Sequence, residues 1–191
     1  MTRGEIFLPV SREEMIQRGW YYYDFLVVTA DGYIDHPSFG STLIARLLEA
    51  EGYRVAVLAQ PDWHSAEAFR AMGKPRYGVL IGGGNLDSMV AHYTVAKRRR
   101  TRDLYSPGGE MGHRPDRPTI VYTNRAREAF PDTPIVIGGL EVAGLAEVAR
   151  QVVDGDDVAA VQQGQAAFDD VGQFADVAGP GVTAEDAHDL V

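Results

Sequence analysis

The sequence contains no cysteine, and this absence excludes several kinds of chemistry. A chain without thiols cannot form a disulfide, use a thiolate as a nucleophile or hold zinc through sulfur ligands. It also lacks the cysteine ligands on which iron–sulfur clusters depend. We therefore predict that this chain has no catalytic residues, no metal site and no cofactor of its own.

Long hydrophobic runs are also absent. No apolar stretch approaches the roughly 18 residues that a membrane-spanning helix needs. The first residues, Met1-Thr2-Arg3-Gly4-Glu5, lack the apolar stretch of a secretory signal. The chain is thus predicted to be cytoplasmic, with no membrane partner.

Basic residues are outnumbered, and the net charge of −9 argues against nonspecific binding to nucleic acid. One segment runs against this balance, with four basic residues at 97–100 and a fifth at Arg102. This segment could hold a phosphate group or the acidic face of a partner. The alternative that we favour is a solvated helix end, where cations are stabilised by the helix dipole.

Four short apolar runs alternate with segments of helical periodicity, which predicts an α/β fold. Continuous apolar runs bounded by glycine or polar residues are typical of strands buried on both faces of a parallel sheet. The predicted strands are 24–30, 54–59, 77–81 and 134–137. The predicted helices are 41–51, 65–72, 86–99 and 118–130. This alternation indicates a doubly wound parallel sheet with right-handed crossovers.

The regions outside this alternation differ in composition. Residues 101–116 are rich in glycine, proline and charge, which predicts a long loop. Residues 142–191 form a divergent acidic tail after a domain that spans 1–141. We expect a helix at 141–153 and poor order from about residue 154, because low hydrophobicity combined with like charge does not favour an ordered backbone.

Ligands of open parallel sheets bind beyond the carboxyl ends of the strands. Three loops of this chain occupy such positions, and their polar and glycine residues form a candidate cofactor-binding set. Alternatively, Asp35 or Ser38 caps the next helix, His36 packs locally, and the glycines only end a strand. The candidate set is Asp35, His36, Gly83, Gly84, Asn85, Asp87, Gly138 and Gly139.

Several blocks of sequence resemble, in order, the start of YgiQ-type radical SAM proteins. The resemblance covers about residues 5–141 and is specific, because the blocks are long. They are Ile6-Phe7-Leu8-Pro9-Val10-Ser11-Arg12, Asp35-His36-Pro37-Ser38-Phe39-Gly40, Ala59-Gln60-Pro61-Asp62-Trp63, Gly84-Asn85-Leu86-Asp87-Ser88-Met89-Val90, Arg114-Pro115-Asp116-Arg117 and Ile135-Val136-Ile137-Gly138-Gly139-Leu140-Glu141.

This resemblance implies a cobalamin-binding-like domain with flavodoxin-like strand order. In the full-length family it implies a following barrel, whose three cysteines hold a 4Fe-4S cluster that cleaves S-adenosylmethionine. Histidine-ligated cobalamin domains carry an Asp-x-His-x-x-Gly loop. Here Asp35 and His36 are adjacent and Gly40 lies four residues further on, which does not match that loop.

Three interpretations of function remain open. The chain is an accessory N-terminal domain whose partner is a separate radical SAM barrel, and it is inactive alone. Alternatively, it is a stand-alone module that binds a nucleotide-like or corrinoid ligand. The third interpretation is an inert product of a truncated or frameshifted gene, because the match ends abruptly after Glu141.

Overall fold

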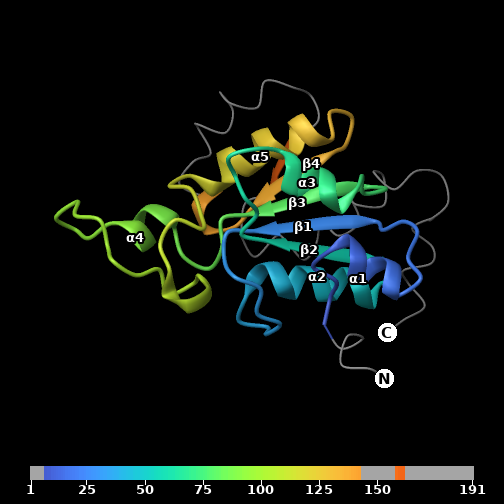
Figure 1. Ribbon diagram of the computed structural model, residues 1–191, viewed down its shortest axis with the longest axis horizontal. Helices are drawn as coiled ribbons and strands as arrows, with labels where there is room; N and C mark the ends of the chain where they lie inside the picture. The colour runs from blue at the N-terminus through green and yellow to red at the C-terminus, as the bar shows by residue number, and fades with distance from the viewer. Residues whose placement is uncertain (1–6, 143–157, 162–191) are drawn as a thin grey trace.

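The computed structural model describes residues 7–142 and 158–161 (Figure 1). Within these residues, helices and strands alternate along the chain as the sequence predicts for an α/β fold. In chain order the elements are α1 (Arg12–Gln17), β1 (Phe25–Thr29), α2 (Gly40–Ala50), β2 (Val55–Ala59), α3 (Glu67–Met72), β3 (Gly78–Gly82), α4 (Ser88–His92), the 3-10 helix η2 (Pro107–Gly109), α5 (Pro118–Ala129), β4 (Ile135–Gly138) and β5 (Val158–Val161).

The strands form one parallel sheet in the order β2-β1-β3-β4-β5. Helix α2 packs on β1 and β2, whereas α5 packs on β3 and β4 and also contacts α3. Figure 1 shows α2 on one face of the sheet and α3 and α5 on the other. The predicted doubly wound sheet with flavodoxin-like order is therefore confirmed, including the adjacency of β1 and β3.

Alternate residues of each strand enter two separate hydrophobic layers, as the pleat of a strand requires. In β1, Leu26 and Val28 join the larger cluster with Phe69 and Tyr122 from the helices. Val27 points to the opposite layer and packs with Ala45 of α2. Burial on both faces explains why the strands are continuous apolar runs in the sequence.

Helix α1 is the one described α-helix that the sequence interpretation missed. The Ser11 side chain caps it by accepting a hydrogen bond from the Glu14 amide. The predicted helices at 41–51, 65–72 and 118–130 correspond to α2, α3 and α5 within a few residues. The predicted long loop at 101–116 is also present and contains only η2.

The predicted helix at 86–99 is wrong over most of its length. Helix α4 ends at His92, and Tyr93 is extended and pairs with Arg99 in an antiparallel bridge. The chain reverses between them through a turn in which the Lys97 amide donates to the Thr94 carbonyl, with Lys97 at a φ of 57°. The basic segment is therefore a turn and its return arm, and it is not a helix end.

The structure describes only a small part of the predicted tail. Val158–Val161 form β5, which pairs with β4 and was not expected from the composition. A helix begins at Leu140, so the start of the helix expected at 141–153 agrees with the structure. The rest of that helix and the predicted poor order of the tail lie outside the described residues.

No helix within residues 7–142 has the length and apolar character that crossing a bilayer requires.

A pair of Leu→Ala substitutions tests the two-layered core. Leu26 is fully buried in β1, and Leu47 on the outer side of α2 is 52% exposed. We expect Leu26→Ala to lower the free energy of unfolding by about 2–5 kcal/mol, since it leaves a cavity in a packed layer. Leu47→Ala should lower it by less than about 1 kcal/mol. Equal losses in urea denaturation would contradict this assignment of the core.

Candidate functional site

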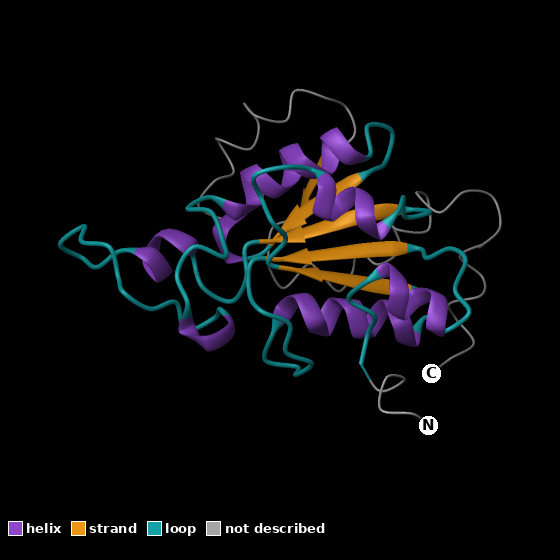
Figure 2. Ribbon diagram, in the orientation of Figure 1, coloured by secondary structure: helices purple, strands orange, loops and turns teal. Residues whose placement is uncertain are grey.

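The described strands β1 to β4 end together at one edge of the sheet. Thr29, Ala59 and Gly82 are aligned in register, and Gly138 is aligned with Gly82. Figure 2 shows the strands pointing toward the side from which α4 and the loops around it project. The loops that carry the candidate residues therefore start from a common edge, as parallel strands require.

Asn85 ties the loop after β3 to the loop after β1. Its side-chain amide donates to the Ser38 carbonyl at 2.8 Å and accepts from the Gly40 amide at 3.3 Å. Its backbone amide donates to Asp31 Oδ2 at 2.7 Å. Residues about 50 positions apart in sequence thus meet at this edge.

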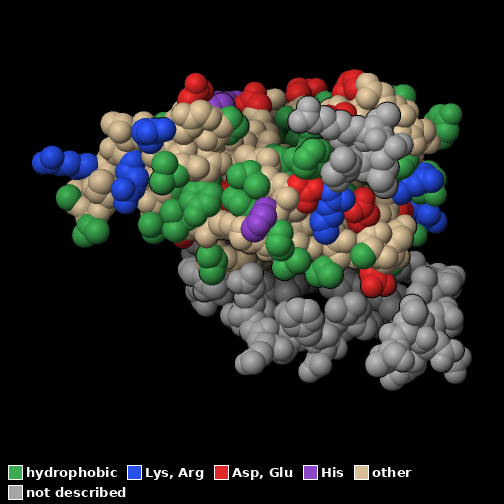
Figure 3. All heavy atoms as spheres, turned by 90° about the horizontal axis from the view of Figure 1, so that it is seen from below, with side chains coloured by type: hydrophobic (Ala, Val, Ile, Leu, Met, Phe, Trp, Pro, Cys, Tyr) green, Lys and Arg blue, Asp and Glu red, His purple; other side chains and the backbone are tan. Residues whose placement is uncertain are grey.

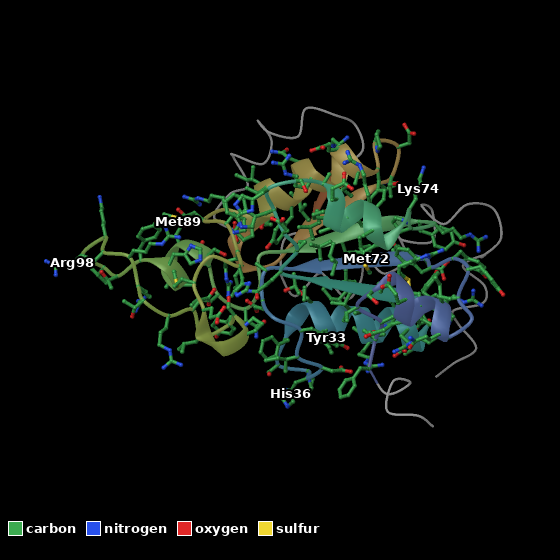
Figure 4. All side chains as sticks on the ribbon, viewed as in Figure 1. Tyr33, His36, Met72, Lys74, Met89 and Arg98 are labelled. Carbon is green, nitrogen blue, oxygen red and sulfur yellow. The ribbon has the colours of Figure 1, made fainter. Side chains whose placement is uncertain are left out.

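The other polar candidates have partners of their own. Asp35 forms an ion pair with Arg46 of α2, which holds the pKa of this carboxyl below its ordinary value. Asp87 caps α4 by accepting from the Met89 amide at 2.8 Å and the Val90 amide. His36 is exposed, with Nδ1 2.7 Å from Ser38 Oγ, and points away from the sheet in Figure 4.

These contacts decide between the local alternatives. Neither Asp35 nor Ser38 caps α2, whose N-cap residue Phe39 makes no side-chain capping bond. His36 does pack locally, as the plainer interpretation predicted. Because Asp35 is held by Arg46, this loop has no His–Asp pair of the kind that orients a metal-binding histidine. The loop therefore does not fit histidine-ligated cobalamin.

Carboxylates of the chain itself occupy the space beside two of the candidate glycines. A Cβ atom at Gly83 would overlap the Glu141 side chain, and one at Gly84 would overlap Asp31. Gly84 also has a φ of +91°, which L side chains rarely adopt. Gly138 and Gly139 lie at the end of β4. The ligand-binding role of the eight candidate residues stays a prediction.

A buried ion network that the sequence interpretation missed lies next to these glycines. Arg114 is fully buried and donates to both oxygens of Asp103, at 2.7 Å from Nε and 3.1 Å from Nη2. Its Nη1 lies 3.1 Å from Asp31 Oδ1. The guanidinium also lies 5.8 Å from the centre of the Tyr105 ring. Arg114 thus joins the strand β1 edge to the long loop.

Further hydrogen bonds attach the same loop to β1 and β2. Ser106 Oγ donates to Asp103 Oδ2 at 2.8 Å, and Gln60 Nε2 donates to Ser106 Oγ at 2.7 Å. Gln60 Nε2 also donates to the Ala30 carbonyl, and the Gly32 amide donates to the Tyr105 carbonyl. The loop at 101–116 is therefore anchored to the sheet edge by side chains from several segments.

The two carboxylates of the network respond differently to burial. Burial raises the pKa of Asp31 above its ordinary value, although the Asn85 amide and Arg114 act in the opposite direction. Burial also opposes ionisation of Asp103, but hydrogen bonds from Arg114, the Tyr105 amide and Ser106 outweigh it and lower the pKa. Asp103 is therefore the more strongly stabilised anion of the pair.

Glu141 is another buried carboxylate, with 2% of its surface exposed. Neither of its oxygens has a hydrogen-bond partner among the described residues. Burial and the charge of Asp87 raise its pKa to about 7. The nearby Thr119 amide and the charge of Arg117 act in the opposite direction, although the amide forms no hydrogen bond with the carboxylate. Near neutral pH this side chain is therefore poised between its protonated and ionised forms.

His92 and Tyr93, at the end of α4, form a third polar group with Asp116, which lies at the end of the long loop 101–116. His92 Nδ1 lies 2.6 Å from Asp116 Oδ1, and the Tyr93 hydroxyl donates to Asp116 Oδ2 at 2.8 Å. These bonds outweigh the effect of burial and lower the pKa of Asp116. They hold the end of α4 against the segment that leads into α5.

Comparison with protein families gives a match to the family described as "Radical SAM N-terminal", over residues 7–157. The chain belongs to the radical SAM N-terminal family. This confirms the resemblance drawn from the sequence blocks. No solved structure is significantly similar to this one.

Among curated proteins, a "UPF0313 protein" of Clostridium perfringens (strain SM101 / Type A) is 58% identical over 137 residues. A "UPF0313 protein" of Clostridium botulinum (strain Loch Maree / Type A3) is 54% identical over 137 residues. In each case the match covers 72% of this chain and 21% of the relative. The chain thus spans about a fifth of the length of these relatives.

The radical SAM family implies a 4Fe-4S cluster and S-adenosylmethionine in its full-length members. The residues of this chain do not fit the cluster, because it has no cysteine. Within residues 7–142 there is also no group of three or more His, Asp or Glu side chains arranged to hold a metal ion.

Removing the guanidinium of the buried network should destabilise the fold strongly. We expect Arg114→Met to lower the free energy of unfolding by about 3–5 kcal/mol, because it leaves Asp31 and Asp103 buried without a counter-ion. Adding Asp31→Asn should recover part of the loss. The matched control Arg70→Met breaks only exposed ion pairs and should change the free energy of unfolding much less. Similar losses for the two arginines in chemical denaturation would contradict the network.

The raised pKa of Glu141 predicts a pH-dependent effect of Glu141→Gln. A carboxyl whose pKa is raised by folding stabilises the protein fully below its ordinary value of 4.5, and this contribution is lost as the pH rises past about 7. The variant should match the wild type at pH 4 and be more stable by about 2 kcal/mol at pH 8. Thermal unfolding measured across this range tests it, with the exposed Glu51→Gln as control. A variant that is less stable at pH 8 would show that ionised Glu141 is required.

Proposed function

We propose that this chain acts as an accessory N-terminal domain of a radical SAM system, whose catalytic part is a separate radical SAM barrel in the cytoplasm. The observation that carries the proposal is the absence of cysteine in a chain that belongs to this family. A chain of this kind can supply binding and positioning, while the cofactor chemistry belongs to another polypeptide or segment.

The geometry of the sheet edge supports this assignment. Open parallel sheets bind ligands beyond strands such as β1 and β3, and here Asp31 accepts from the Asn85 backbone amide and pairs with Arg114 at that edge. Gln60 and Ser106 close the side of this edge next to β2. Ion pairs and hydrogen bonds within the chain hold this edge together. This arrangement fits a domain that is already assembled without a ligand better than it fits one with an open cavity for a large cofactor.

A segment replacement in the Clostridium perfringens relative tests the accessory role. Three forms are compared: the intact relative, a form without the 137 aligned residues, and a form in which the matching part of this chain replaces them. After reconstitution with iron, sulfide and reductant, we expect deletion to slow S-adenosylmethionine cleavage about tenfold or more. Replacement should restore it, since the segments are 58% identical.

The isolated 191-residue chain serves as the negative control in the same assay. It should form no cluster absorbance and release no cleavage product, because it has no thiolate ligands. Deletion without any loss of rate, or replacement without any recovery, would contradict an accessory role. A cluster formed by the isolated chain would contradict the proposal that the cluster chemistry belongs to a separate barrel.

A further inference from the structure

The basic segment of this chain does not occupy the helix end that the sequence pattern favoured. Helix α4 ends at His92, and the arginines lie on the return arm that follows the turn at Lys97. The Arg100 amide donates to the His92 carbonyl, and its Nε donates to the carbonyls of Val90 and Tyr93. Arg100 therefore caps the carboxyl end of α4, as a cation near a helix C-terminus does, but the helix end gives no account of Arg98, Arg99 and Arg102.

A hollow of about 680 Å³ lies between α4 and this return arm. Its size falls in the range of small-molecule sites. Apolar and aromatic side chains line part of it, and the rest is lined by arginines together with two threonines and Asp103. The lining residues on which this inference depends are Val90, Leu104, Tyr105, Arg98, Arg99 and Arg102. Figure 3 shows basic side chains beside hydrophobic ones at the end of the molecule where α4 lies in Figure 1.

Three arginines of the hollow form no ion pair with a described residue, although the charge of Arg99 helps to lower the pKa of Asp116. Among the described residues, Arg98, Arg99 and Arg102 form no ion pair, whereas Arg46 and Arg114 each pair with a carboxylate. The one acidic residue that lines the hollow, Asp103, is buried and already bonded to Arg114 and Ser106. In a chain with a net charge of −9, so many unpaired cations at one hollow point to an anionic ligand.

The chemistry of the lining narrows the class of anion. Guanidinium groups bind phosphate oxygens through paired hydrogen bonds, and several of them match the charge of a di- or triphosphate. Tyr105 and the exposed Leu104 offer surface to an aromatic or apolar group. The basic residues of the hollow lie at one end of an acidic protein, which argues against an extended nucleic-acid-binding surface.

We propose that the hollow between α4 and the return arm binds a small phosphorylated ligand of the nucleotide class. Its phosphates contact Arg98, Arg99 and Arg102, and its aromatic part lies against Leu104 and Tyr105. This site is distinct from the sheet edge, and it goes beyond the accessory role, since it concerns binding by this chain alone.

Isothermal titration of the full-length chain with ATP at low salt tests the proposal, with inorganic pyrophosphate and adenosine as partial ligands. We expect ATP to bind, pyrophosphate to bind more weakly and adenosine not to bind detectably. Arg99→Gln with Arg102→Gln should weaken ATP binding about tenfold or more, since both remove charge-assisted hydrogen bonds. Arg99→Lys with Arg102→Lys should give an intermediate affinity.

The matched control removes two positive charges elsewhere. Arg70→Gln with Lys74→Gln changes exposed residues, and Figure 4 shows Lys74 at the opposite end of the molecule from Arg98. This control should leave ATP affinity unchanged. An equal loss in the control, unchanged binding by the arginine variant, or no ATP binding by the wild type would overturn the proposal. Tighter binding of a short oligouridylate than of ATP would overturn the small-ligand class.

Because the ligand is titrated into the isolated chain, failure here is distinguishable from failure of the accessory role, which the segment replacement measures. The side chains of Arg99 and Arg102 are exposed, so their substitution should leave thermal unfolding unchanged. A folded variant with lost binding therefore assigns the effect to the hollow.

Discussion

The buried guanidinium of Arg114 lies between two carboxylates from distant parts of the chain, Asp31 at the end of β1 and Asp103 in the long loop. Burying three charged groups is costly unless each is paired and hydrogen-bonded. This requirement fixes the position of the loop over the sheet edge. Because Asp31 also accepts from the Asn85 amide, the same network sets the position of the loop after β3.

The polar residues of this domain have two roles, according to whether they lie at the carboxyl edge of the sheet or in the segment between α4 and the long loop 101–116. At the edge, Asp31 accepts a hydrogen bond from the Asn85 amide and forms an ion pair with Arg114, and these contacts hold the loops together. Beside α4, Arg99 and Arg102 form no ion pair with a described residue and line a hollow. The part of the domain that is closest to the strands is thus closed by its own side chains, and the charged hollow lies further out.

The sheet could be predicted from the sequence because each central strand is buried on both faces, as the run from Phe25 to Thr29 illustrates. The adjacency of β1 and β3 followed from the flavodoxin-like strand order that the family resemblance implies. The end of α4 could not be predicted, because tertiary contacts decide it: His92 and Tyr93 bond to Asp116, more than 20 residues away. The Arg114 network was missed for the same reason, although a lone Asp31 directly after an apolar strand was an available signal.

Hydrogen exchange at two backbone amides tests the anchoring of the long loop most directly. The Gly32 amide donates to the Tyr105 carbonyl and the Asn85 amide donates to Asp31, so both depend on the network. We expect these amides to exchange slowly in the wild type, nearly as slowly as those of β1, and to lose protection in Arg114→Met under conditions where β1 stays protected. Rapid exchange at Gly32 and Asn85 in the wild type would contradict the account.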